Sequence, residues 1–365
     1  MCCETHIGGQ IVKYNGKNIY EENPSAANCY RQEYADSIDR YISALEAASY
    51  KNREKFMPSD GFAENIEKYR NDYIKMLGAP LTDYKSRVPN VKSEYVASDD
   101  ACKIYRLSIE TMDNFFFYGM LMIPHGVERA PLAVAQHGGY GTPELCSDMH
   151  GKNNYNHMVQ RLLERGLVVF APQLLIWNDG DALETAPNYD VKYNRDEIDK
   201  KLKHYGSSIT ALEIYNIRRS IDYLETLDCV KADKICMMGL SYGGFFTLYT
   251  MAADKRIVSG YSCGCFNDRV KFSTVDWTWK NSGNTFHDAE IAGLCAPRRL
   301  YLEVGKTDDV FDYHSAVNEA PRVEKYFAAL NASQNICFHV WDGGHKVNAE
   351  DDGLDFFLKE IKAKK

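Results

Sequence analysis

The chain lacks the features that mark several large classes of protein. Its 365 residues contain no run approaching the roughly 18 consecutive apolar residues of a membrane span, and no dense block of Lys and Arg. With 43 basic residues against 51 acidic ones and a net charge of -8, the chain is poorly suited to nucleic acid or to an anionic membrane surface. We therefore expect a small-molecule ligand, with no nucleic-acid partner and no membrane partner.

A secretory leader is also missing from the first residues, Met1 to His6, which have no basic start followed by an apolar core. We therefore expect a cytoplasmic protein. The 11 cysteines are odd in number, which favours free thiols over a disulfide framework. No two cysteines have the Cys-x2-Cys spacing of a zinc site, so we expect neither a metal nor a cofactor.

The composition, 45% hydrophobic and 26% charged, is that of a globular protein. From about Asn28 to Leu77, apolar and aromatic residues recur at steps of three and four, which predicts helices. The breaker segment from Met57 to Gly61 interrupts this pattern, so a helical pair is expected. Residues 1–90 are therefore predicted to form an N-terminal helical extension that packs on the rest of the chain, joins a homo-oligomer, or covers the substrate.

From Val91 onward, predicted strands alternate with predicted helices. The residues from Glu94 to Glu110 and from Phe115 to Ile123 are expected to pair as an antiparallel hairpin. Further short apolar strands, separated by helical stretches, are expected near residues 132–135, 167–171, 234–238, 257–262, 299–304 and 337–341. This alternation predicts an α/β domain over residues 91–365, with a mostly parallel central sheet and helices on both faces.

One segment fits none of these units. Residues 173–206 are rich in Asn, Asp and Lys and lie between a predicted strand and a predicted helix. Long loops in compact domains are often lids or binding loops, and open α/β sheets bind ligands at the carboxyl ends of their strands. The segment is thus expected to be either a lid or a solvated insertion.

The pentapeptide Gly239-Leu240-Ser241-Tyr242-Gly243 lies between an apolar strand and a helix-like stretch. A serine at such a strand-to-helix turn is held in strained backbone geometry, and flanking glycines let neighbouring chain approach it. The pattern predicts Ser241 as a catalytic nucleophile.

A serine nucleophile needs a base, and the base needs a carboxylate to orient it. Asp308 follows the strand predicted at 299–304, and His345 follows the last predicted strand. These two residues are the expected partners of Ser241, with Asp309 as the competing acid. The other histidines, including His137, are assigned no proton transfer.

Acyl transfer also requires hydrogen-bond donors for the oxygen that becomes negatively charged. The segment His137-Gly138-Gly139-Tyr140-Gly141 follows a predicted strand and can turn tightly toward the serine. We expect the backbone amides of Tyr242 and of Gly139 or Tyr140 to form this oxyanion hole.

Four sequence blocks together resemble the dienelactone-hydrolase-like and acetyl xylan esterase-like branch of the α/β-hydrolase superfamily. They are residues 216–224, 239–244, 296–299 and 305–308. The resemblance implies hydrolysis of carboxylic esters through an acyl-serine, with no metal. The sequence departs from the family pattern at Gln173, where Asp is usual, and in the tract that follows it.

The leading hypothesis is a serine esterase that removes short acyl groups, such as acetyl, from a sugar or small alcohol. Trp177, Trp277 and Trp279 are candidates for stacking on a sugar, although core packing is the more common role of tryptophan. The alternatives are a peptidase resembling the prolyl oligopeptidase catalytic domain and a non-catalytic α/β-hydrolase scaffold.

Overall fold

The computed structural model describes residues 9–175 and 193–361. The chain divides into two compact units, Met1–Asn52 and Arg53–Lys365. The boundary between these two units lies within the first of the predicted N-terminal helices. The division into an extension over residues 1–90 and a catalytic domain over residues 91–365 stays a prediction. Within the described residues, none of the helices combines the length and the apolar character that crossing a membrane requires.

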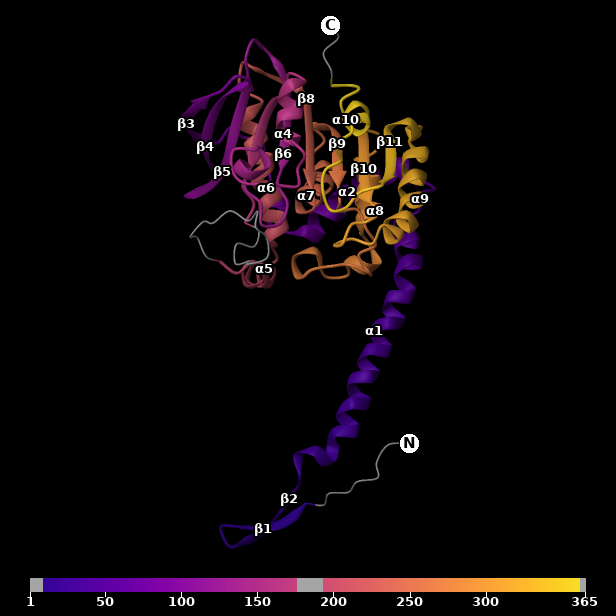
Figure 1. The fold of residues 1–365 in the computed structure, drawn as a ribbon. Coiled ribbons are helices and arrows are strands. Elements are labelled where there is room, and N and C mark those ends of the chain that lie inside the picture. The colour runs from indigo at the N-terminus through magenta and orange to yellow at the C-terminus, as the bar shows by residue number, and fades with distance from the viewer. Residues whose placement is uncertain (1–8, 176–192, 362–365) are drawn as a thin grey trace. The chain divides into compact units, whose positions relative to one another are not determined.

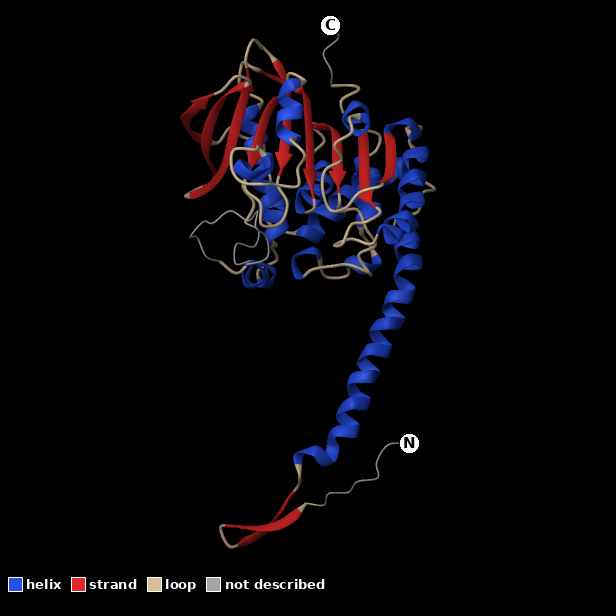
Figure 2. Ribbon diagram, in the orientation of Figure 1, coloured by secondary structure: helices blue, strands red, loops and turns tan. Residues whose placement is uncertain are grey.

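The first unit contains a hairpin and most of one long helix (Figures 1 and 2). The hairpin strands are β1 (Gln10–Tyr14) and β2 (Lys17–Glu21), which pair only with each other. The sequence analysis did not anticipate them. The helix is α1 (Asn28–Phe56), which continues across the boundary into the second unit. The helix α2 (Phe62–Leu77) follows it, so two helices form where the apolar periodicity predicts them.

The second unit is built on a nine-stranded sheet with helices on both faces (Figure 2). The strand order is β11-β10-β9-β8-β6-β7-β5-β4-β3. All pairs from β11 to β7 are parallel, and β5, β4 and β3 are joined antiparallel. The strands are β3 (Asn90–Ser98), β4 (Cys102–Met112), β5 (Phe115–Pro124), β6 (Ala130–Gln136), β7 (Val168–Pro172), β8 (Val230–Leu240), β9 (Ile257–Cys263), β10 (Arg299–Gly305) and β11 (Ile336–Trp341).

Alternation along the buried strands divides the core between the two faces of the sheet. Leu132 and Val134 of β6 belong to one apolar cluster, and Ala133 and Ala135 belong to the other. Successive strand side chains point to opposite faces, so one strand contributes to both cores. The helices that complete these layers are α3 (Pro143–Cys146), α4 (Met158–Glu164), α5 (Arg195–His204), α6 (Ile209–Leu224), α7 (Tyr242–Ala253), α8 (Asp288–Cys295), α9 (Tyr313–Ala329) and α10 (Asp352–Phe357).

Two of the predicted elements have different bounds in the structure. The stretch from Glu94 to Glu110, expected as one strand, is broken by a turn between β3 and β4. Asp99 makes this turn, because its Oδ1 accepts hydrogen bonds from the backbone N–H groups of Ala101 and Cys102 at 2.9 and 2.8 Å. Before the strand predicted at 167–171, the helix α4 begins only at Met158, after turns at Asn156 and His157 with positive φ.

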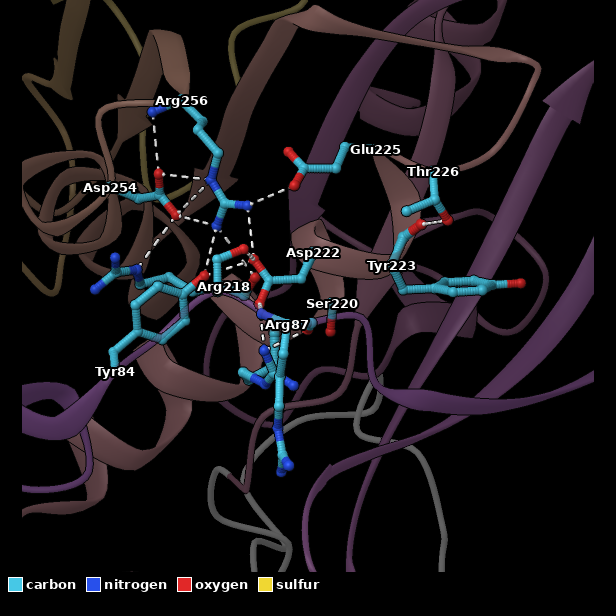
Figure 3. A network of polar contacts seen from close by, with 12 residues as sticks. Tyr84, Arg87, Arg218, Ser220, Asp222, Tyr223, Glu225, Thr226, Asp254 and Arg256 are labelled. Atoms are coloured by element: carbon cyan, nitrogen blue, oxygen red, sulfur yellow. Dashed lines mark hydrogen bonds and ion pairs between the residues drawn. The ribbon is translucent and has the colours of Figure 1, made fainter.

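The block at residues 216–224 forms most of α6 and carries a buried polar network (Figure 3). Asp222 accepts hydrogen bonds from the Tyr84 hydroxyl at 2.6 Å and from Arg256 at 2.7 Å, and it also pairs with Arg219. Arg256 in turn pairs with Asp254, which follows α7. Residues 216–224 thus join the end of α7 to the segment before β3. Their role in the fold is structural.

Candidate active site

The turn between β8 and α7 holds Ser241 in a rare backbone conformation. Its φ of 60° and ψ of -121° lie in a region that costs energy for any residue with a side chain. The Ser241 N–H donates to the carbonyl of Cys263 at 2.9 Å, and the Ser241 carbonyl accepts from Phe245 at 2.9 Å. Hydrogen bonds on both sides therefore hold the strained turn, as expected for a nucleophile elbow.

The glycines of this turn are required by close backbone approach. A Cβ at Gly243 would lie 2.1 Å from the carbonyl oxygen of Gln136, and one at Gly244 would lie 2.6 Å from that of Cys263. A Cβ at Gly239 would lie 2.5 Å from the backbone of Gly243. Real Cβ atoms do not approach other atoms so closely, so no larger residue fits without moving the chain.

Asp308 lies three residues after the end of β10 and contacts His345. Its Oδ2 is 2.8 Å from Nδ1 of His345. Its Oδ1 accepts hydrogen bonds from the backbone N–H groups of Val310 and Phe311 at 2.8 and 2.9 Å. Both oxygens of this carboxylate are thus held in place. Asp309, the competing acid, is exposed.

A cavity of about 570 Å³ brings most of the predicted site residues together. Ser241 and His345 both line it, as do the three residues expected to supply oxyanion amides, Gly139, Tyr140 and Tyr242. Asp308 stands behind His345 and does not line the cavity, whereas Asp309 does. The remaining wall is mostly apolar or aromatic and includes Leu145, Leu240, Phe272, Trp277, Val310 and Phe311.

The loop after β6, which carries Gly139 and Tyr140, is held by the buried side chain of His137. The Nδ1–H of His137 donates to the carbonyl of Gly138 at 2.8 Å, and its Nε2 accepts from the N–H of Leu174 at 2.9 Å. Burial lowers the pKa of His137 to about 4, so the ring is neutral near pH 7. The neutral ring has one donor and one acceptor, which matches these two contacts.

Two residues that the sequence analysis did not single out also shape the site. The hydroxyl of Tyr155 accepts a hydrogen bond from the N–H of Gly138 at 2.8 Å. The Nδ2 of Asn154 donates to the carbonyl of His345 at 2.9 Å. These neighbours thus connect the loop after β6 with the loop that carries His345. A Tyr or Asn in a loop has no distinctive sequence pattern, and only spatial proximity identifies these two.

The segment at 173–206 is connected to the site through Arg195, the first residue of α5. Its Nε lies 2.7 Å from Asp276, and its Nη2 lies 2.9 Å from Glu213; all three side chains are buried. Asp276 in turn accepts a hydrogen bond from the hydroxyl of Tyr242 at 3.1 Å. One end of the segment is thus fixed beside the nucleophile turn. Residues 176–192, including Trp177, lie outside the described residues, and the lid role of the segment stays a prediction.

Within the ranges that the structure describes, no group of three or more His, Cys, Asp or Glu side chains is arranged to hold a metal ion. The sheet, the strained serine and the paired carboxylate and imidazole together have the architecture of an α/β-hydrolase.

Comparison with known proteins agrees with this class. Residues 121–271 match the family model described as "Dienelactone hydrolase family". A protein of Bacillus subtilis (strain 168) named "Putative hydrolase YtaP" is 27% identical over 154 residues, which are 40% of this chain. That match spans about half the length of the curated relative.

Solved structures with the same fold include three esterases. A "putative acetyl xylan esterase" from Bacteroides fragilis NCTC 9343 has a TM-score of 0.63 at 12% identity, covering 89% of this chain and 90% of the other. The glucuronoyl esterase from Solibacter usitatus has a TM-score of 0.59 at 13% identity, covering 84% and 94%. Acetyl Xylan Esterase 1 from Thermoanaerobacterium sp. JW/SL YS485 has a TM-score of 0.55 at 16% identity, covering 82% and 94%.

Residues 121–271 are therefore similar to the dienelactone hydrolase family, and the chain shares its α/β fold with these esterases. This similarity is the one that the four sequence blocks predict.

Proposed function

We propose that the chain is a serine esterase that cleaves carboxylic esters through an acyl-serine intermediate. The observation that carries the proposal is the arrangement around the cavity: Ser241 on a strained turn, and His345 on the same wall with its Nδ1 held by Asp308 at 2.8 Å. The contact with Asp308 engages Nδ1 and leaves the other ring nitrogen, Nε2, to act as the base.

In the proposed reaction, the Oγ of Ser241 attacks the ester carbonyl while His345 takes its proton. Asp308 stabilises the imidazolium that forms. The amides of Tyr242 and of Gly139 or Tyr140 stabilise the oxyanion, and Tyr242 is well placed because it is the first residue of α7, where the helix dipole is positive. His345 then returns the proton to the leaving alcohol, and a water hydrolyses the acyl-serine by the same steps.

The cavity supports a substrate larger than an acetyl group alone. Its volume of about 570 Å³ lies within the range of roughly 300–1,000 Å³ typical of small-molecule sites. We infer that the acyl group is short and that the alcohol is a sugar or another small molecule filling the remaining space. The names of the structural neighbours, acetyl xylan esterase and glucuronoyl esterase, make sugar esters the first class to test.

The aromatic wall gives such an alcohol a surface to contact. Phe272, Trp277 and Phe311 pack together, with the rings of Phe272 and Phe311 4.5 Å apart and those of Trp277 and Phe311 nearly parallel. Phe311 also lies 5.7 Å from the ring of His345. Of the two candidate tryptophans that the structure describes, Trp277 is the one that lines the cavity and can contact a bound sugar. Trp279 is buried in the core, away from the cavity lining.

The test compares the hydrolysis of p-nitrophenyl acetate, butyrate and octanoate by the intact protein and by Ser241→Ala. Removing the nucleophile should lower turnover by about 10⁴–10⁶-fold, and acetate should be the best of the three esters. Ser282→Ala, another serine of the same unit that does not line the cavity, is the matched control and should leave turnover unchanged. An unchanged rate in Ser241→Ala would refute the acyl-serine mechanism, and faster cleavage of a peptide than of any ester would favour a peptidase.

A further inference from the structure

The first part of α1 carries a row of apolar side chains that face solvent. Their exposed fractions run from 43% at Ile38 to 74% at Tyr30. At the 3.6-residue period of a helix, these side chains fall within an arc of about 120°. The α1 stripe, as we name this surface, consists of Tyr30, Tyr34, Ile38, Tyr41, Ile42 and Leu45.

The face of the helix that bears the α1 stripe has no charged residue between Tyr34 and Ala48. The charged residues of this stretch lie outside the arc, and one of them, Arg40, pairs with Glu33 at 2.7 Å. Helices that separate apolar from charged side chains in this way normally bury the apolar face. The sequence of α1 is therefore typical of a helix that packs against another surface.

The described part of the first unit, residues 9–52, does not supply that surface for the α1 stripe. None of residues 9–48 is buried. The β1-β2 hairpin also exposes large apolar side chains, including Ile11 and Tyr14 at 65% and 66%. A two-stranded hairpin is at best marginally stable alone, and helices gain most of their stability from packing. The regular structure of this unit thus requires a partner.

The spacing of the α1 stripe indicates what kind of partner. Tyr34, Ile38, Tyr41, Leu45 and Ala48 follow one another at steps of four, three, four and three residues. This is the spacing of the apolar seam in a coiled coil, in which side chains of one helix fill the gaps between those of the next. A second copy of the same helix presents the same spacing, so the seam matches itself.

The size and charge of the surface agree with pairing between copies. From typical side-chain areas, the exposed parts of the six residues amount to roughly 700 Å² per chain, close to the ~800 Å² per partner of a standard interface. Residues 28–52 carry three basic and four acidic residues, so two copies repel each other little. The slight acidic excess also disfavours an anionic lipid surface.

We propose that the α1 stripe is a self-association surface through which two copies of this chain pair helix against helix. The proposal is independent of the chemistry at Ser241. The chain is then a dimer in solution, and its first unit is stabilised by the partner copy.

The experiment measures the mass of the full chain in solution by light scattering and sedimentation equilibrium. Replacing Ile38 and Leu45 together by Glu places charge on the seam and should raise the dimer dissociation constant by at least about 100-fold. The matched control replaces Ser43 and Ala47, exposed on the opposite face, by Glu and should remain dimeric. Exchanging the two seam residues, as Ile38→Leu with Leu45→Ile, should also preserve the dimer. Ester hydrolysis by each variant checks that the catalytic unit is folded.

A wild-type chain that is monomeric at every concentration would overturn the proposal. The same result would be seen if the α1 stripe packed on its own chain or on a different partner. A seam variant that pairs as tightly as wild type would overturn it equally, and so would dissociation of the control on the opposite face. A dimeric wild type and control together with a monomeric, active seam variant would support it.

Discussion

Two of the three arginines of helix α1 lie in opposite environments. Arg40, in the first unit, pairs with Glu33, and both side chains are more than 60% exposed. Arg53, in the second unit, lies 2.9 Å from Glu290 and 2.8 Å from Glu319, and none of the three side chains is more than 4% exposed. The same residue type on one helix is thus a solvated surface charge at one position and the centre of a buried ionic cluster at the other.

The apolar residues of the two helices differ in the same way. Tyr69, Tyr73 and Leu77 of α2, spaced at steps of four residues, are buried in the main core. The α1 stripe, spaced at steps of three and four residues, faces solvent. Periodicity predicts which side of a helix will be buried but not what will bury it. In the second unit the sheet and its helices supply the opposite surface, and in the first unit we propose that a second copy does.

The largest expected difference between the two environments is in stability. Arg53→Met should lower the free energy of unfolding by about 3–5 kcal/mol, because it leaves two buried carboxylates beside only one remaining cation, Arg322. Arg40→Met should change it by less than about 1 kcal/mol, because both partners are hydrated. Urea unfolding of the two variants measures this contrast directly. Equal changes in the free energy of unfolding would show that the buried cluster contributes no more to stability than a surface ion pair does.

A smaller effect on the free energy of unfolding is expected from the burial of His137, whose side chain titrates. His137 has a pKa of about 4, below the ~6.5 of an unfolded histidine, so the unfolded chain binds more protons between these values. Its contribution, on the order of 3 kcal/mol, is present above pH 6.5 and is lost as the pH falls toward 4. Protonation of Nε2 also removes its contact with Leu174.

The measurement is the free energy of unfolding from pH 7 to pH 4 for wild type, His137→Gln and the control His204→Gln, whose side chain is exposed. The free energy of unfolding should change less with pH in His137→Gln than in the other two proteins. The same slope in all three proteins would assign the acid sensitivity to other groups. His287, whose pKa burial lowers to about 3, is the next candidate.

The smallest effect is a change in kcat/KM, expected on replacing Asp309, an exposed charged residue at the cavity. Asp309 lines the opening, and no described Lys or Arg does so. Asp309→Asn should raise kcat/KM for an ester that carries a free carboxylate by about twofold to fivefold at low salt, and the gain should disappear in high salt because solvent screens exposed charges. A neutral ester of the same size is the control. A loss of about 10³-fold or more on the neutral ester would instead identify Asp309 as the catalytic acid.

Much of the second unit was predictable because its signals are local. The apolar runs predicted six parallel strands, and Gly-x-Ser-x-Gly between a strand and a helix predicted the turn that holds Ser241 at a φ of 60°. The errors were also local. A single Asp99 side chain reverses the chain where one long strand was expected, and the β1-β2 hairpin has too short a pattern to be recognised.

The sequence by itself predicted the order Ser241, Asp308 and His345 for the proposed nucleophile, acid and base. It also determined the alternation of strands and helices that brings parallel strand ends to one edge of a sheet. Only the tertiary structure decided that Asp308, and not Asp309, contacts His345, and that Tyr155 and Asn154 hold the loops around the cavity. It also decided that Arg53 is buried while Arg40 is not. The physical reason is that backbone preferences and apolar spacing act over a few residues, whereas burial and polar contacts depend on segments more than a hundred residues apart.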